Sequence, residues 1–518
     1  MTSIQSAEDE NYPRIDPKRT PGRLASLVTA TSARGDWRAA AAIIEKNWDT
    51  FANEAPHHLL AALKALPAEA LIETPGMVVA ANYLQQVVLN GEPSRFFHDG
   101  RLTPDLRDGE GADLDTLILL TGQSAGARTG GRLDEARATA ERARDALRSL
   151  SSAQRAPMVT SLPHLRFQWG RSLDAADAPG ALAEYEGAYE LARLTDQSVI
   201  ARRAAGHIAW HHAERGRLRR AEQWFARAQA EPATTGRYDV VVFLTSALLR
   251  YDRGDQEASQ HLGRALGLPL GEHWAAALWL AAMLEHTKPG ASSVYADLET
   301  ELERHPEVRS LEGANGRYIK AAQARLARIR PRLRAARPLP TSPSALDHLL
   351  AAAQAYRTDH FADTIAHGNA ATTLTAAPRV EAAALMMASA SHLALGHPGL
   401  AVDAFRHANA TIGRERLFSA YGFVPLATTT TLAELSGESI HGATPNVDAP
   451  HLPKLTKRES EVLALLPTGM ALPLIAAELY ISPNTLKATV RTLYRKLGVR
   501  SRHEAVDAAR NALRQGDS

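Results

Sequence analysis

One short spacing of small and bulky residues recurs along most of this chain. An Ala is followed four positions later by a packing residue and seven positions later by a second Ala, often after a turn glycine. Five sets follow this spacing closely: Ala136/Ala140/Ala143, Ala181/Tyr185/Ala188, Ala221/Phe225/Ala228, Ala258/Leu262/Ala265 and Ala401/Phe405/Ala408. Residues four and seven apart share one face of an α-helix, and alanine lets two helices approach closely. The spacing therefore predicts pairs of packed helices.

Two weaker sets begin at Ala40, with Ile44, and at Ala362, with Ala366. Adjoining sets begin 37 to 45 residues apart, which is the period of helical hairpins. Strand signals are scarce between residues 23 and 435, so the predicted fold class is all-α. This body loosely resembles tetratricopeptide-like repeats. The alternative is an irregular helical bundle whose spacing merely reflects an alanine-rich composition.

Composition divides the chain into segments. The first residues carry acids and prolines but no apolar run, which is unlike a signal peptide or an anchor. Two stretches rich in proline interrupt the helical pattern further along. We expect a disordered arm (1–22), a helical repeat domain (23–330), a Pro- and Arg-rich break (331–343), further helical hairpins (344–435), a flexible linker (436–453) and a small C-terminal domain (454–515).

Two absences narrow the class of protein. The longest apolar stretches, such as Trp274 to Leu284, have about half of the ~20 residues that cross a bilayer. No membrane segment is therefore expected. The chain has no cysteine, which excludes disulfides, thiolate metal sites and a cysteine nucleophile. Both observations fit a cytoplasmic protein.

Charge is unevenly divided along the chain. Residues 454–518 hold eleven Lys or Arg against six Asp or Glu, a net charge of +5, whereas the remainder carries −3. A basic end on a slightly acidic body is expected when that end meets a polyanion such as nucleic acid. On charge alone, a solvated basic surface is the alternative.

The basic segment contains signals for several short helices. Thr456 and Glu459 form a capping box before an apolar run. Ser482 is a strong N-cap and Pro483 a favoured first residue, so a helix should run from Pro483 to about Leu497. Its buried stripe would be Leu486, Val490, Leu493 and Leu497, and its outer face would carry Lys487, Ala488, Arg491 and Arg495. Such a face can enter the ~12 Å major groove of DNA, where Arg and Lys pair with guanine and phosphate.

From Leu455 to about Ala512 the chain is similar to the helix-turn-helix domain of the LuxR family. The resemblance is carried by two stretches, LTKRESEVLALLPTG and IAAELYISPNTLKATVRTLYRKLGVRSRHEAV. The resemblance implies that Lys487, Ala488 and Arg491 face base edges. It also implies that Thr485, Arg495 and Lys496 lie near the phosphate backbone. Members of this family usually bind inverted-repeat promoter sites in double-stranded DNA as homodimers and regulate transcription, often as activators. Contact with RNA polymerase is a further implication.

Two departures from the family pattern stand out. Ala471, Leu472, Pro473 and Leu474 occupy positions where the family usually has a Ser N-cap followed by Asn, Lys and Glu. Losing that cap costs about 1 kcal/mol, partly offset by the proline. We expect the two leucines, Leu472 and Leu474, to contact the helical body or a partner subunit. Thr489 replaces a frequent His, which would shorten the reach toward the DNA backbone.

Two motifs could suggest catalysis or metal binding, but their context argues against both, and the motif of a nucleotide-binding ATPase is absent. Gly122-Gln-Ser124-Ala-Gly126 fits the Gly-x-Ser-x-Gly elbow of hydrolases, but Gly130-Gly131 would break the helix that an elbow opens, so we interpret it as a glycine-rich loop. No Gly-Lys pair occurs, which excludes a P-loop. The pairs His57-His58 and His211-His212 point to different sides of a helix, so metal binding is not expected. We predict no enzyme, cofactor or metal.

The sequence is thus best explained as a transcription regulator. A helical-repeat domain would sense a ligand or protein partner on its concave surface, and a LuxR-like domain would bind DNA. The rival interpretation is a repeat scaffold for protein interactions, with a degenerate DNA-binding tail.

Overall fold

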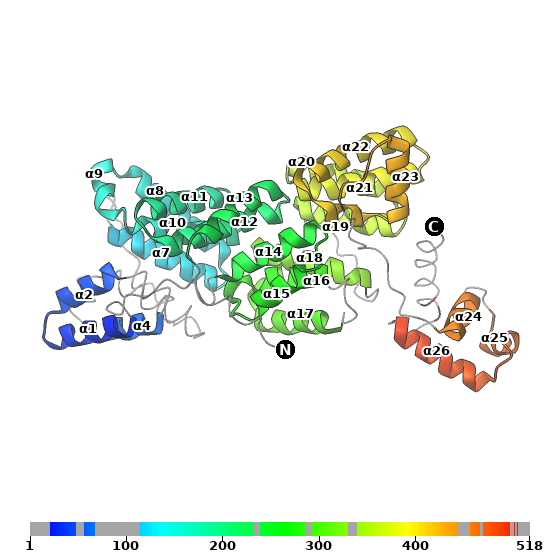
Figure 1. Ribbon diagram of the computed structural model, residues 1–518, viewed down its shortest axis with the longest axis horizontal. Helices are drawn as coiled ribbons and strands as arrows, with labels where there is room; N and C mark the ends of the chain where they lie inside the picture. Colours follow the sequence, from blue (N-terminus) through cyan, green and yellow to red (C-terminus); the bar gives the residue numbers. More distant parts are fainter. Residues whose placement is uncertain are drawn as a thin grey trace, which may run out of the picture.

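The computed structural model describes residues 21–47, 56–67, 114–232, 239–284, 292–329, 339–442, 456–466 and 470–497, together with Arg502 and Ala505. No strand occurs in these residues, which confirms the predicted all-α class. Figure 1 shows helices packed side by side along the body in blue, cyan, green and gold, and three small helices in orange and red near the C-terminal end. None of the described helices combines the length and apolar character needed to cross a membrane.

Three helices form a small unit at the N-terminal end: α1 (Pro21–Ala33), α2 (Trp37–Lys46) and α4 (Pro56–Lys64). Val28, Ile44 and Leu59 are fully buried between them and make a core of their own. Ala40 is buried beside Ile44, so this weaker repeat set does supply a packing face.

The central helices are α7 (Leu114–Thr129), α8 (Leu133–Ser149), α9 (Ser152–Arg155), η2 (Ala156–Met158), α10 (Leu162–Ala175), α11 (Ala181–Leu194), α12 (Ser198–Glu214), α13 (Leu218–Ala230), α14 (Val240–Asp252), α15 (Ala258–Leu266), η4 (Gly271–His273), α16 (Trp274–Leu284), α17 (Ser292–Arg304), η6 (Pro306–Ser310) and α18 (Gly313–Ile329). Successive helices pair as hairpins, α7 with α8, α10 with α11, α12 with α13 and α14 with α15. The last hairpins comprise α19 (Ala345–Arg357), α20 (Phe361–Leu374), α21 (Pro378–Ala394), α22 (Pro398–Glu415), η8 (Phe418–Phe423) and α23 (Leu426–Ser436).

The recurring spacing marks the packed face of one helix in each of five hairpins. Its alanines are buried in α8, α11, α13, α15 and α22, and so are Tyr185, Leu262 and Phe405, while Phe225 is half-buried. The glycines before these sets and before the Ala40 set adopt positive φ in the turns: Gly35, Gly131, Gly216, Gly254 and Gly396. The predicted helical hairpins are therefore present, while the likeness to tetratricopeptide repeats stays a prediction.

The set assigned to α20 is wrong in register. Ala362 and Ala366 are exposed, whereas Thr364, Gly368 and Ala371 are buried. The buried trio keeps the same spacing but begins two residues later. Gly368 packs against Ala384 of the neighbouring α21, where a Cβ would lie 3.6–3.7 Å from it, so a residue as small as alanine would also fit there. Alanine alone does not identify the packed face, because Thr364 and Gly368 occupy two of its three buried positions here.

The core runs across the segment where the sequence predicts a break. One hydrophobic cluster extends from Trp210 in α12 to Ala433 in α23. Arg379, at the start of α21, pairs with the fully buried Asp252 of α14, with Nη2 2.6 Å from Oδ2. Arg379 also donates to the carbonyls of Ala213 and Glu214 at the end of α12. Residues 344–435 are thus anchored on the earlier hairpins by buried charge as well as by apolar contact.

The first part of the predicted flexible linker is packed. Residues 437–442 follow α23 and run along α22 and η8 as a strap. The Asn409 amide donates to the Glu438 carboxylate at 2.6 Å and to the Ser439 carbonyl, and the His441 backbone N–H donates to the Tyr421 hydroxyl. Ile440 packs on the core of the body. These six residues of the expected linker thus contact the body, while residues 443–453 lie outside the described part and the flexible linker stays a prediction.

The C-terminal domain consists of α24 (Lys457–Leu465), α25 (Leu472–Glu478) and α26 (Pro483–Leu497). Its apolar residues form a separate cluster around Val462, Ile475, Leu486 and Leu493. The predicted fourth helix falls mostly outside the described residues, but Ala505 is helical and buried in this cluster.

Candidate nucleic-acid interface

Helix α26 forms as the sequence predicts and begins at a side-chain cap. The Thr485 backbone N–H donates to the Ser482 hydroxyl at 3.1 Å, and Pro483 occupies the first helical position. Leu486, Val490 and Leu493 are buried against α24 and α25. The N-terminal turn of α26 is thereby held firmly, and its opposite face is turned away from the core.

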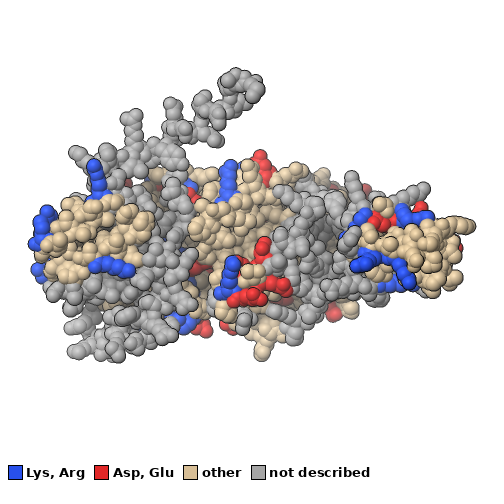
Figure 2. All heavy atoms as spheres, turned by 90° about the horizontal axis from the view of Figure 1, so that it is seen from below, with Lys and Arg blue, Asp and Glu red and all other residues tan. Residues whose placement is uncertain are grey.

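Three of the six predicted contact residues form one exposed surface on that opposite face. Lys487, Ala488 and Arg491 are exposed. Neither Lys487 nor Arg491 makes an ion pair or hydrogen bond within the described part of the chain. Figure 2 shows blue Lys and Arg side chains on the surface of this end of the molecule. Unpaired cations on a helix face are suited to contact the phosphates and bases of a DNA groove.

Two other predicted residues are engaged inside the domain. The Thr485 hydroxyl lies 2.8 Å from the Ser482 hydroxyl. The Lys496 ammonium donates to the Glu459 carboxylate at 2.6 Å, and Glu459 also accepts from the Thr456 backbone N–H in the predicted capping box. The Lys496 ammonium and the Thr456 N–H lower the pKa of Glu459. Lys496 therefore connects the end of α26 to the start of α24 instead of extending outward.

The remaining predicted contact, Arg495, lies in α26, but its side chain is outside the described residues.

Thr489 does not reach outward, because its hydroxyl donates to the Thr485 carbonyl at 2.9 Å. Thr489 was expected to reach less far toward the DNA backbone than the His it replaces. Its hydroxyl is bonded within the helix, which agrees with that expectation.

Arg502 is a residue that sequence reasoning missed in this role. Its guanidinium donates to the Leu466 carbonyl at 2.9 and 3.0 Å and also to the Met470 carbonyl. These carbonyls flank the connection between α24 and α25, so Arg502 holds that connection in place. A carbonyl acceptor leaves no side-chain pattern in sequence, and the family resemblance was the only available signal.

The unusual start of α25 is partly buried and partly open. Ala471 is the N-cap and makes no side-chain cap, as the sequence indicates. Leu472 packs partly against the domain's own core, whereas Leu474 is 58% exposed and Tyr480, after α25, is 94% exposed. The expected contact of Leu472 and Leu474 with the body or a partner subunit stays a prediction.

The Gly-x-Ser-x-Gly motif lies within a helix and not in a loop. Ser124 is in the middle of α7, is 1% exposed, and donates to the Ala136 carbonyl of α8 at 2.8 Å. The small residues of the motif allow α7 and α8 to pack closely. The loop interpretation is therefore wrong, and a buried hydroxyl already used by a carbonyl is not placed as a nucleophile.

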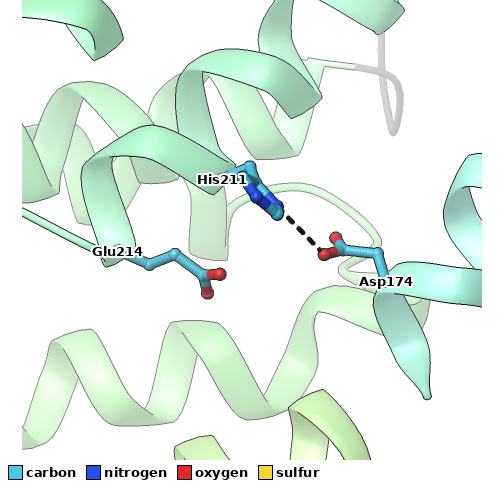
Figure 3. A group of neighbouring side chains, drawn as sticks. All are labelled: Asp174, His211 and Glu214. Carbon is cyan, nitrogen blue, oxygen red and sulfur yellow. Dashed lines mark hydrogen bonds and ion pairs between the residues drawn. The ribbon is translucent and has the colours of Figure 1, made fainter. Parts of the chain in front are cut away.

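A second cluster has the composition of a metal site. Asp174 of α10 and His211 and Glu214 of α12 bring their ligand atoms within 4.8 Å of one another, and Figure 3 shows the three side chains converging. His211 Nδ1 lies 3.3 Å from Asp174 Oδ1. These are residue types that bind divalent cations.

The surroundings of this cluster argue for an ion-pair network. Arg215 and Arg317 both pair with the Glu214 carboxylate, and the Tyr318 hydroxyl donates to it. Burial alone would raise the pKa of Glu214, but the two guanidinium groups lower it to about 2. A cation entering here would have to displace two arginines, so the donor set does not fit a metal. The network instead joins α10, α12 and α18.

Comparison with known proteins places only the C-terminal domain. Residues 453–509 match the sequence model described as bacterial regulatory proteins, luxR family. The probable transcriptional regulatory protein NarL from two strains of Mycobacterium tuberculosis is 51% identical over 61 residues, which is 12% of this chain and 28% of NarL. The HTH-type transcriptional regulator MalT of Serratia proteamaculans is 45% identical over 60 residues, 12% of this chain and 7% of MalT.

The chain thus spans less than a third of the length of these relatives. The family model matches the segment that holds α24, α25 and α26. The order of these helices, the capped start of α26 and its outward cations agree with a helix-turn-helix arrangement, in which the second helix of the motif enters the major groove. At residues 453–509 this chain therefore carries the helix-turn-helix domain of the luxR family of bacterial regulatory proteins.

Proposed function

We propose that this chain is a sequence-specific DNA-binding transcription regulator. The observation that carries the proposal is the exposed face of α26, where Lys487 and Arg491 flank Ala488 and have no partner in the described residues. Two positive charges separated by a small residue can pair with guanine edges and phosphates while Ala488 allows close approach to a base. The luxR-family match at residues 453–509 and the regulatory relatives support the same function.

The proposal extends to how the domain is used. Two copies would bind the halves of an inverted repeat, because two-fold related helix-turn-helix domains read two-fold related DNA. We propose that the pair activates transcription through contact with RNA polymerase. Since bacterial DNA lies in the cytoplasm, the protein would act there and needs no enzymatic step.

The helical body would receive the signal, as a ligand or protein partner. Stacked hairpins offer long surfaces for such a partner. Part of the surface of α10 and α12 is already covered by α18 of the same chain, since Tyr318 accepts from the Trp210 indole and Arg317 pairs with Glu214. The effector would therefore bind a different part of the hairpins, or would compete with α18.

DNA selection tests the DNA-binding proposal directly. Full-length protein at about 0.15 M salt, the physiological range, should enrich one inverted repeat from genomic fragments. Arg491→Ala should weaken binding to that site by about 5- to 150-fold, the worth of one good base contact. Arg137→Ala, which removes an exposed arginine of α8, is the matched control and should leave binding unchanged.

An interaction scaffold would behave differently. Neither the wild type nor Arg491→Ala would enrich a motif, and the two proteins would have the same weak affinity for any DNA. That result would contradict the proposed function. A wild type that enriches a repeat but does not change transcription from it in a purified polymerase assay would contradict activation alone.

A further inference from the structure

Asn484 lies in the first turn of α26 and points in the middle of the exposed side when the helix is viewed along its axis. No sequence pattern singled it out. At about 100° per residue, positions four and seven later fall on the same side of a helix. These positions are Ala488 and Arg491, two of the residues expected to face base edges. The buried stripe of Leu486, Val490 and Leu493 lies on the opposite side. Asn484 is therefore the most N-terminal of three residues on this face, followed by Ala488 and Arg491.

The Asn484 side chain is available for an external partner. It is exposed and makes no hydrogen bond with any residue that the structure describes. Asparagine near a helix start often serves as a cap, but here Ser482 already accepts from the Thr485 N–H. The neighbouring hydroxyls of Thr485 and Thr489 are used internally, by Ser482 and by a helix carbonyl. On the described α26 face, Asn484 thus presents a neutral hydrogen-bonding group that has no such internal role.

The chemistry of the group selects a base. An amide presents one acceptor and two donor hydrogens side by side. In the major groove, adenine presents an acceptor at N7 beside a donor at N6, and Asn pairs with both. Guanine presents two acceptors there, which suits Lys487 and Arg491 and does not suit an amide. The N-terminal residues of a recognition helix are those that contact base edges.

We propose that Asn484 is a specificity-determining residue that reads an adenine in each half-site. The inference rests on the proposed DNA binding and deepens it, because it names a base and the residue that reads it. The adenine would adjoin the base pairs contacted by Lys487 and Ala488, one helical turn along α26. The half-site would therefore combine an adenine read by Asn484 with guanine read by the two cations.

The test compares the base preferences of full-length variants. Selected DNA from wild type should contain one adenine per half-site that Asn484→Ala no longer requires, with a loss of about 10-fold in preference at that position and little change elsewhere. Asn484→Lys should shift the preference at the same position from adenine toward guanine. Thr489→Ala removes a neighbouring hydroxyl that is bonded internally and should leave every preference unchanged.

Several outcomes would overturn the inference. If Asn484→Ala keeps all base preferences, or weakens binding equally on every sequence with a smaller salt dependence, Asn484 contacts phosphate or nothing. Retained preference at the other positions of the motif shows that the variant domain is still folded. If wild type enriches no motif beyond Arg491→Ala, the proposed DNA reading fails as a whole. If wild type enriches a motif without adenine at a position sensitive to Asn484, only the assignment of Asn484 fails.

Discussion

The helical body and the C-terminal domain use arginine in opposite ways. In the body, Arg128, Arg202 and Arg379 are turned inward and pair with Glu272, Asp239 and Asp252. In the C-terminal domain, Lys487 and Arg491 of α26 are exposed and have no described partner. Buried arginine–carboxylate pairs therefore join hairpins in the body, whereas the exposed cations of the C-terminal domain remain available to a ligand. The comparison shows that residue type alone does not distinguish a structural cation from a binding one.

The largest effect is expected where a buried pair of the body is broken. Asp252→Ala leaves the Arg379 guanidinium without its carboxylate and should lower the free energy of unfolding by about 3–5 kcal/mol. All seven tryptophans precede residue 280, so tryptophan emission during heating reports the body alone. DNA affinity at 25 °C should not change.

The matched control for this change is an exposed pair. Asp134→Ala removes the partner of Arg137, and the Asp134 side chain is 98% exposed. Exposed pairs contribute at most about 1 kcal/mol, so the tryptophan transition should hardly move. Equal effects of Asp252→Ala and Asp134→Ala would contradict the structural role given to buried charge.

Acidification should also distinguish the two regions. Burial lowers the pKa of His207 below its usual range and that of His273 to about 4. The unfolded chain binds protons at these histidines near pH 6.5 but the folded body does not, so stability falls as pH drops from 7 toward 4. For His273 the loss at pH 5 is about 2 kcal/mol.

Tryptophan melting curves at pH 7 and pH 5 measure this effect. The C-terminal domain has a single histidine, His503, so its transition, followed by DNA binding against temperature, should change less than that of the body over the same range. Replacing His207 and His273 together by Gln should reduce the response of the body and leave the part due to His212, whose pKa burial also lowers to about 4. An unchanged pH response in that double variant would show that other groups are responsible.

A smaller effect is expected at the clamp of the C-terminal domain. Arg502→Leu removes donors from the Leu466 and Met470 carbonyls and should destabilise the domain by about 1–3 kcal/mol. DNA binding should be lost at a lower temperature while the tryptophan transition stays in place. Arg458→Ala, which removes a surface pair with Glu461, serves as the control and should have little effect.

The smallest expected effect concerns Lys496. Each phosphate contact adds about 0.9 to the slope of log affinity against log salt. Arg491→Ala should therefore reduce the slope by up to that amount if Arg491 touches phosphate, whereas Lys496→Met should leave it unchanged, because Lys496 pairs with Glu459. A reduced slope for Lys496→Met would mean that the ammonium leaves Glu459 when DNA binds.

Local signals predicted much of this structure. The capping box at Thr456 and the span of α26 from Pro483 to Leu497 match the expectation, as do the turn glycines of the hairpins. Each depends on residues within a few positions of one another. The physical causes, a side-chain cap or a left-handed turn, act at that range.

Contacts between distant residues were beyond the sequence. Arg379 and Asp252 are 127 positions apart, and nothing nearby in either segment marks them as partners. Lys496 was assigned to phosphate from a family resemblance, although Glu459, 37 positions earlier, receives its ammonium. The α20 register failed because the buried positions are Thr364, Gly368 and Ala371, and an alanine pattern does not mark the first two.

The strap of residues 437–442 has a consequence for promoter architecture. Thirteen residues, 443–455, separate its end from the Thr456 cap, and a chain of that length spans at most about 50 Å. Half-sites one helical turn apart are about 34 Å from each other along DNA. Releasing the six strap residues would lengthen the connection between each body and its DNA-binding domain by about 20 Å. In the proposed pair of copies, the contacts of Asn409 with the strap would therefore limit how far apart two half-sites can lie while two bodies remain together.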